Sequence, residues 1–410
     1  MRLLWIKTEL LHPVDKGGRI RSYQMLRSLA RRHHVTYLCL DDGQAAADAL
    51  ERAREYAHEV VTVPFAPPPK GSAGYLRALL FNLFSPLPYA IGRYQSAALR
   101  AEIARLAGDS DLVVCDFLMS SVSVPDALPA PTVLFQHNVE AQLWERHATV
   151  PQNLLRRAYM QLQWHRMQRY EEAQCRRFDH VVGVSALDAA LMRRQYGVSA
   201  VSHVETGVDF EFFSAKGPRD STGQGLVFVG SMDWMPNADG IRWFASEVFP
   251  LVKREVPGAT LTVVGRSPSN AMRALAAADS AIEVTGTVPD VRPYLERAAL
   301  SVVPLRIGGG TRLKIYEAMA MGSPVVATAI GAEGLPIRHG EHLLIADGAV
   351  AQAEAIVGLL REPPRAQQLA ANALRFVREH CGWDGVAEQF LSQCVSSRRG
   401  AAREPEDQVA

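Results

Sequence analysis

The stretch Leu300–Thr328, LSVVPLRIGGGTRLKIYEAMAMGSPVVAT, decides the fold. It opens with the apolar run Leu300–Val303 and closes with a second one, Val325–Ala327. Between them, three glycines precede a helical segment that stops at Gly322 and Pro324. A short buried strand, a glycine turn, a helix and another buried strand make up the repeating unit of a parallel sheet. The stretch therefore predicts an α/β protein with doubly wound sheets.

The same alternation of apolar runs and helical segments extends along the rest of the chain. In the first half it predicts strands at Leu3–Lys7, Val35–Leu40, Val60–Val63, Leu112–Cys115, Thr132–Phe135, Val181–Val184 and Val201–Val204. After a polar, turn-rich segment it restarts and predicts strands at Leu226–Val229, Leu261–Val264, Ile282–Val284, Leu300–Val303, Val325–Ala327 and Leu343–Ile345. A single core stops growing at about 250–300 residues, so 410 residues predict two Rossmann-like domains, 1–205 and 206–378. The polar tail 396–410 is expected to be disordered.

Composition excludes several classes of protein. Lys and Arg total 44 and Asp and Glu total 43, a balance that argues against a nucleic-acid binder. The five cysteines form no C-x-x-C pair, so neither a disulfide framework nor a zinc site is predicted. A reducing, cytoplasmic location is expected.

No membrane-spanning segment is predicted. The most apolar stretch, Tyr75–Tyr94, is interrupted by Arg77, Arg93, Pro86 and Pro88. The N-terminal segment is not a signal peptide, because charged residues interrupt its apolar run and no small-residue cleavage site follows.

The glycine turn after Val303 is the strongest candidate for a ligand site. Backbone N–H groups of a glycine turn and a helix N-terminus bind anions, and the cations of the first turn add full charges. A carboxylate two turns further on suits the hydroxyls of a ribose. The predicted contacts to a nucleoside diphosphate are Gly308, Gly309, Gly310, Thr311, Arg312, Lys314 and Glu317. The alternative is an ordinary solvated helix N-terminus with a Lys–Glu pair.

The segment EAMAMG, Glu317–Gly322, with GGTRLK before it, resembles the donor loop of retaining glycosyltransferases of the GT-B fold, the large family-four-like bacterial group. The resemblance implies two Rossmann-like domains facing a cleft. It also implies that Glu317 holds the ribose of the donor. The family often has a first glutamate eight positions before this one, associated with the transferred sugar. In this chain that position is Gly309, so the first glutamate of the family motif is missing.

Further segments of the second half resemble the same donor domain. The strand ending at Val229 leads into Gly230 and Ser231, which are expected to contact the diphosphate through their backbones. Gly265 leaves room for a flat ligand, and the resemblance places Val288 near the base. For both Gly265 and Val288 an ordinary strand–helix turn is the alternative interpretation.

In the first half, two glycines follow the first predicted strand. Gly17 and Gly18 lie at the start of a helix and are expected to face the donor, with Asp15, Lys16 and Arg19 close enough in sequence to contribute. A structural turn is the alternative.

Polar residues also follow two later strands. His137 follows the predicted strand Thr132–Phe135 after one residue, Gln136, at the sheet edge where doubly wound folds bind ligands. By resemblance it contacts a sugar hydroxyl or the reacting oxygen, which makes His137, Arg312 and Lys314 the candidate catalytic residues. Glu140 and Asp116 are weaker candidates, and Glu140 also suits a helix start without chemistry. The segments HNVE and DKGGRIRS resemble sugar transferases of exopolysaccharide systems, and residues 379–395 resemble the helix that crosses back to the first domain.

Together these features predict transfer of a sugar from a UDP- or GDP-linked donor to a sugar or lipid-linked sugar, with retention of configuration by resemblance. No Asp-x-Asp motif occurs, so no metal and no cofactor are expected. A nucleotide-sugar 2-epimerase on the same fold and a non-catalytic nucleotide-sugar-binding protein are the alternatives. An epimerase would consume the donor without an acceptor, and a binding protein would show no turnover.

A basic segment suggests where the acceptor comes from. Arg146–Arg177 contains seven Arg and two Glu, together with Trp144 just before it and Tyr159, Trp164 and Tyr170 within it. Basic and aromatic helical surfaces bind anionic lipid, so peripheral contact with the inner face of the plasma membrane is one hypothesis. A solvated helix with its aromatic residues in the core is the other.

Overall fold

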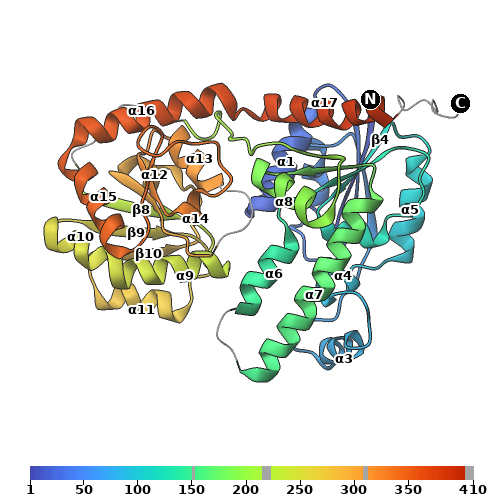
Figure 1. Ribbon diagram of the computed structural model, residues 1–410, viewed down its shortest axis with the longest axis horizontal. Helices are drawn as coiled ribbons and strands as arrows, with labels where there is room; N and C mark the ends of the chain where they lie inside the picture. The colour runs from blue at the N-terminus through green and yellow to red at the C-terminus, as the bar shows by residue number, and fades with distance from the viewer. Residues whose placement is uncertain (150–152, 215–222, 308–312, 402–410) are drawn as a thin grey trace, which may run out of the picture. The chain divides into compact units, whose positions relative to one another are not determined.

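The computed structural model of the chain describes residues 1–149, 153–214, 223–307 and 313–401 (Figure 1). The chain divides into two compact units. The first contains residues 1–205 and the C-terminal segment that starts at Asp384, and the second contains the described residues between Thr206 and Trp383.

The first unit is built on a seven-stranded parallel sheet with strand order β3-β2-β1-β4-β5-β6-β7. Its strands are β1 Arg2–Lys7, β2 His34–Asp41, β3 Glu59–Pro64, β4 Leu112–Asp116, β5 Thr132–Phe135, β6 His180–Gly183 and β7 Val201–His203. Every residue of β4 is buried, as expected for a strand that helices cover on both faces. The order reverses between β1 and β4, and ligands of doubly wound folds bind at the carboxyl ends of the strands at this point.

The second unit has a six-stranded parallel sheet with order β10-β9-β8-β11-β12-β13. Its strands are β8 Gly225–Val229, β9 Thr260–Val264, β10 Ile282–Gly286, β11 Leu300–Val303, β12 Val325–Ala327 and β13 Leu344–Ile345. The order reverses between β8 and β11. All thirteen strands lie within two residues of the predicted positions, and the prediction of two doubly wound domains is confirmed.

Helices connect the strands in both units. Those of the first unit are α1 Gly17–Ala30, α2 Ala49–Arg52, α3 Ala73–Asn82, α4 Tyr89–Gly92, α5 Ala97–Ala107, α6 Glu140–Thr149, α7 Leu154–Arg177 and α8 Ala186–Tyr196. Four of them begin at a Ser or Asn whose side chain accepts a hydrogen bond from the first turn, at Ser72, Ser96, Asn153 and Ser185. The remaining helices are α9 Met235–Trp243, α10 Phe249–Glu255, α11 Asn270–Ala278, α12 Arg292–Arg297, α13 Leu313–Ala320, α14 Ala329–Ala332, α15 Ala349–Arg361, α16 Pro363–His380 and α17 Trp383–Ala401.

Helix α17 completes the core of the first unit. The ring of Phe390 lies 5.7 Å from that of Trp5 and 5.0 Å from that of Phe135. The expectation of a disordered tail from Ser396 is wrong as far as Ala401, because extending an existing helix costs little and no proline stops it. Residues 402–410 lie outside the described part of the chain.

Candidate functional site

Asp116 is the centre of a buried polar network in the first unit. It ends β4, and its Oδ2 accepts hydrogen bonds from Trp5 Nε1 (2.8 Å), Lys7 Nζ (3.0 Å) and Ser22 Oγ (2.5 Å). Lys7 Nζ also donates to Ser22 Oγ at 2.8 Å. Trp5 and Lys7 come from β1 and Ser22 from α1, so the network joins two neighbouring strands and a helix at the carboxyl edge of the sheet. Sequence reasoning missed Lys7 and Ser22 and ranked Asp116 as a weak candidate.

His137 lies against the other oxygen of the same carboxylate. Its Nε2 is 2.8 Å from Asp116 Oδ1, but the two atoms are not aligned for a good hydrogen bond. The imidazole packs edge-on against Phe117, whose backbone adopts a left-handed φ of 84°. A Cβ added to Gly18 would lie 3.7 Å from His137 Nδ1. The structure therefore places His137 beside the first turn of α1.

Burial and charge determine the protonation states in this network. Burial opposes ionisation of Asp116, but Lys7 and His137 outweigh it and hold the pKa of the carboxyl well below its usual range. Burial lowers the pKa of His137 to about 4, so the imidazole is neutral near pH 7. A neutral imidazole donates from one nitrogen and accepts at the other. Both ring nitrogens are buried, and among the described residues neither has a well-aligned hydrogen-bond partner.

The remaining first-unit candidates surround the start of α1. Gly17 is exposed and begins the helix, whose first turn contains no acidic residue and has no side-chain cap. Lys16 is the N-cap residue. Arg19 pairs with Glu9 and lies 3.6 Å from Asp15, so its charge is already largely compensated.

Glu140 starts α6, where the sequence allowed either chemistry or a structural role. It is buried beside Glu171, and Asn138 Nδ2 donates to it at 3.2 Å. Glu171 accepts the backbone N–H groups of Glu140 and Ala141 at 2.8 Å each, and therefore caps the helix from α7. Burial and the neighbouring Glu171 carboxyl raise the pKa of Glu140 to about 8. Burial raises the pKa of Glu171 to about 7, an effect that its hydrogen bonds from Ala141 and Glu140 oppose. This geometry favours the structural role for Glu140.

Stability of the first unit should therefore depend on pH. The native state keeps a proton on Glu140 that the unfolded chain releases above its ordinary pKa of 4.5, so the free energy of unfolding falls as the pH rises from about 4.5 to about 8. Glu140→Gln removes this titration. As the pH rises from about 4.5 to about 8, the free energy of unfolding of the variant minus that of the wild type should increase by about 2–4 kcal/mol. Urea unfolding at pH 5, 7 and 8.5 measures the difference. The exposed control Glu51→Gln should show none; an equal pH dependence in Glu140→Gln and the wild type would contradict the assignment.

In the second unit, Lys314 is held beside the glycine that ends the first strand. It lies in α13, and its Nζ donates to Asn237 Oδ1 of α9 at 2.5 Å. Asn237 Nδ2 in turn donates to the carbonyl oxygen of Ser231 at 2.8 Å. A Cβ at Gly230 would lie 3.0 Å from Lys314 Nζ and 2.9 Å from Asn237 Nδ2, so a larger residue would crowd both groups. Gly230, Ser231 and Lys314, three of the predicted donor contacts, thus lie close together, and their role in binding a donor stays a prediction.

Gly265 allows two strand ends to approach closely. A Cβ at this position would overlap the carbonyl oxygen of Gly230. Arg266 follows it, donates from Nε to Ser231 Oγ at 2.6 Å, and pairs with Asp233 at 3.1 Å. The sequence indicated no basic residue near the Gly230 loop, because this one comes from the end of the neighbouring strand β9.

Glu317 lies one turn beyond Lys314 on α13. Burial raises the pKa of its carboxyl to about 7, an effect that Lys314 opposes. Among the described residues no hydrogen bond to this carboxyl is found. Val288 is partly buried against an apolar cluster that contains Ile315. Gly308, Gly309, Gly310, Thr311 and Arg312 lie outside the described residues.

Two family models match the chain. The model for Glycosyltransferase Family 4 matches residues 16–212, and that for Glycosyl transferases group 1 matches residues 223–362. The chain belongs to this glycosyltransferase family. It is therefore a glycosyltransferase, and neither the epimerase nor the non-catalytic alternative receives support from the comparisons.

Relatives of known sequence agree with this family. An "Uncharacterized 44.6 kDa protein in cps region" of Klebsiella pneumoniae is 23% identical over 92% of this glycosyltransferase and 96% of the relative. The D-inositol 3-phosphate glycosyltransferase of Rhodococcus jostii (strain RHA1) is 28% identical over 51% of this chain and 46% of its own length. The match to that relative thus spans about half of each protein.

Solved structures share the fold. A sucrose-phosphate synthase from Thermosynechococcus elongatus superposes with a TM-score of 0.73 at 18% identity, over 98% of this glycosyltransferase and 100% of the synthase. The Anabaena protein HepE, solved in complex with UDP and glucose, gives a TM-score of 0.66 at 15% identity over 97% and 100% of the two chains. Both superpositions are consistent with the GT-B fold.

Proposed function

We propose that this glycosyltransferase transfers a sugar from a UDP- or GDP-linked donor to a sugar or lipid-linked sugar acceptor, with retention of configuration. The second unit binds the donor and the first unit binds the acceptor. The observation that carries the proposal is the placement of Lys314 by Asn237 beside Gly230, at the carboxyl end of β8. A fixed ammonium at the end of a parallel strand is suited to a diphosphate. HepE, which shares the fold, was solved with UDP, and this supports a nucleotide donor here.

The chemistry needs charge where the bond to the diphosphate breaks. As the bond between the sugar and its phosphate oxygen breaks, negative charge develops on the diphosphate, and prearranged cations and N–H groups stabilise it. Lys314 supplies such a cation, and we expect Arg312 and the glycines 308–310 to add to it. Because protein groups provide this charge, we propose that transfer needs no metal ion. Glu317 is proposed to accept hydrogen bonds from the ribose.

His137 is the proposed contact on the acceptor side. Its neutral imidazole lies against Asp116 and beside Gly18, where it can bind a sugar hydroxyl. The relative in a cps region supports a role in polysaccharide assembly. We propose that this assembly takes place at the inner face of the plasma membrane.

A screen of nucleotide-sugars by thermal shift tests the donor assignment. A ligand at 100 times its Kd stabilises the native state by about 2.7 kcal/mol, so the true donor should raise the Tm measurably. The screen is run in EDTA. We expect a UDP- or GDP-sugar to stabilise the protein there. Absence of a shift with every nucleotide-sugar would reject the donor site, and a shift that appears only with added manganese or magnesium would reject metal independence.

A further inference from the structure

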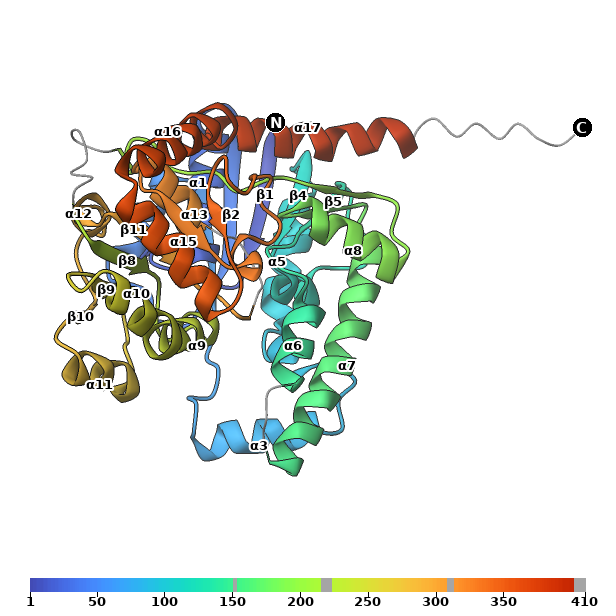
Figure 2. The same ribbon diagram turned by 60° about the vertical axis from the view of Figure 1, so that its left-hand side comes forward.

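Exposed apolar side chains are concentrated on one surface of the first unit, at α3, the loop after it and the N-terminal end of α7. Figures 1 and 2 both show α3 beside that end of α7. More than half of the surface of six large hydrophobic side chains is exposed here: Leu76, Leu80, Phe81, Phe84, Leu154 and Leu155. Phe84 is 90% exposed. In the rest of the described chain, three large hydrophobic side chains are exposed to this extent. Such a patch marks an interaction site.

The charge around this patch has one sign. Residues 65–94 and 153–170 contain no Asp or Glu. Arg77, Arg156, Arg157 and Arg169 are exposed, and none of them has an ion-pair partner among the described residues. We call the six hydrophobic and these four basic residues the α3–α7 surface. Two copies meeting through it would place like charges together, whereas an anionic partner would neutralise them.

The exposed residues are not the ones that the membrane hypothesis for Arg146–Arg177 predicted. Tyr170 is buried and its hydroxyl lies 2.8 Å from Ser121 Oγ, while Trp144 packs against the core. Arg177 forms an ion pair with Asp126, so this basic residue at the C-terminal end of α7 already has a partner within the first unit. Four of the six exposed hydrophobic side chains come from the segment Tyr75–Tyr94, and the other two, Leu154 and Leu155, begin α7.

Buried hydrogen bonds fix this surface to the rest of the unit. Gln163 of α7 donates from Nε2 to Asn82 Oδ1 at 3.0 Å and accepts the backbone N–H of Tyr89 at 2.8 Å. Arg166 donates to the carbonyl oxygens of Asn82 and Leu83, at the C-terminal end of α3. The apolar side chains are therefore held outward by a defined scaffold.

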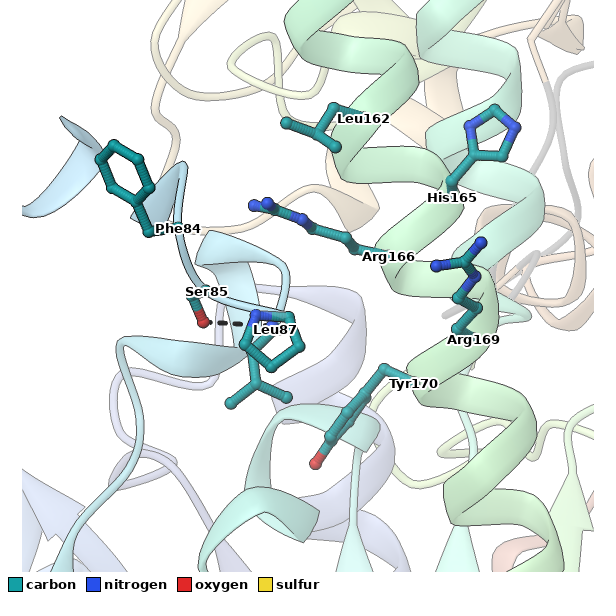
Figure 3. Close-up of a pocket in the computed structure, with 9 residues that line it drawn as sticks. Phe84, Ser85, Leu87, Leu162, His165, Arg166, Arg169 and Tyr170 are labelled. Atoms are coloured by element: carbon teal, nitrogen blue, oxygen red, sulfur yellow. Dashed lines mark hydrogen bonds between the residues drawn. The ribbon is translucent and has the colours of Figure 1, made fainter. Parts of the chain in front are cut away.

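A hollow of about 730 Å³ lies within the same surface (Figure 3). Phe84, Leu87 and Leu162 line it with apolar groups, and Arg166 and Arg169 line it with cationic ones. Figure 3 shows Leu162 and Arg166 extending from α7 towards the segment that carries Phe84 and Ser85. Apolar and cationic groups in one hollow fit a phosphate headgroup and the carbons next to it.

We propose that the α3–α7 surface docks the protein on an anionic lipid bilayer. The hydrophobic side chains enter the boundary between headgroups and acyl chains, and the four arginines contact lipid phosphates. Among the described residues, no helix is both long and apolar enough to cross a membrane. The inference rests on the membrane-associated acceptor of the proposed function and names the residues that make the contact.

Vesicle sedimentation tests the surface independently of sugar transfer. We expect the full-length protein to bind vesicles of 70% phosphatidylcholine and 30% phosphatidylglycerol at low salt, and to dissociate at high salt because the charges are screened. Arg156→Gln/Arg157→Gln should weaken the partition coefficient about 25-fold, since each basic residue contributes roughly a factor of five. Phe81→Ser/Phe84→Ser should weaken it at least about tenfold through lost apolar burial.

Matched controls come from α8 of the same unit. Leu187→Ser and Arg194→Gln alter an exposed leucine and an exposed arginine outside the surface, and should leave binding unchanged. Absence of binding at low salt, equal binding to pure phosphatidylcholine, or equal losses in the controls would overturn the proposal. So would a dimer in sedimentation equilibrium that Phe81→Ser/Phe84→Ser converts to monomer, because a second copy would then cover the patch. Nucleotide-sugar binding in the same variants separates failure of this surface from failure of the donor site.

Discussion

Lys314→Ala should lower kcat/KM for sugar transfer by about 10²–10³-fold, because one fixed donor to a developing charge typically contributes this much. Lys314 Nζ lies 2.5 Å from Asn237 Oδ1, which holds the ammonium beside the Gly230 turn. The loss should fall mainly on kcat, since charge on the diphosphate grows as the bond breaks. Initial rates with the donor found in the screen measure the effect.

Lys253→Ala is the control for this substitution. Lys253 lies in α10 and pairs with Asp279 at 2.7 Å. The substitution therefore removes a positive charge from the same unit without changing the Gly230 turn. Its kcat/KM should equal that of the wild type. If Lys314→Ala retained full activity, Lys314 would have no place in the donor site.

Asp116→Ala should lower the free energy of unfolding of the first unit by about 3–5 kcal/mol, because it leaves the buried ammonium of Lys7 without a counter-ion. Both side chains are almost completely buried, and the ion pair is 3.0 Å long. Urea unfolding measures the loss. Asp126→Ala, which breaks the exposed end of a surface ion pair with Arg177, should cost less than about 1 kcal/mol.

A second variant keeps this prediction testable if Asp116→Ala does not fold. Lys7→Met/Asp116→Ala removes both charges, so it should recover a large part of the lost stability. The double variant should still lose activity, because His137 no longer has the carboxylate that lies against it. A double variant no more stable than Asp116→Ala would show that Lys7 is not the group left uncompensated.

Most of the fold was predictable from local pattern. Buried parallel strands read as short apolar runs with glycine or proline after them, as at Leu300–Val303, so their positions needed no tertiary information. The start of helix α7 follows from local sequence in the same way, since the side chain of Asn153 caps it.

Part of the candidate site was not predictable, because distant segments assemble it. Lys7 lies in an apolar strand and gives no signal of its own, and its partner Asp116 is 109 positions away. Arg266 reaches the Gly230 loop only because β8 and β9 are neighbours. The aromatics near Arg146–Arg177 suggested an exposed surface, but periodicity alone does not separate a helix face that contacts the core from one that contacts solvent.

Helix α17 has a consequence for the order in which the two units are completed during synthesis. Phe390 fills a place between Trp5 and Phe135, so the core of the first unit needs residues made almost four hundred positions after its first strand. The second unit uses a continuous part of the chain and can close while the ribosome is still translating. The N-terminal sheet, although made first, therefore waits with an apolar face open until the last helix emerges. During that interval it is the part of the nascent chain on which a chaperone would act.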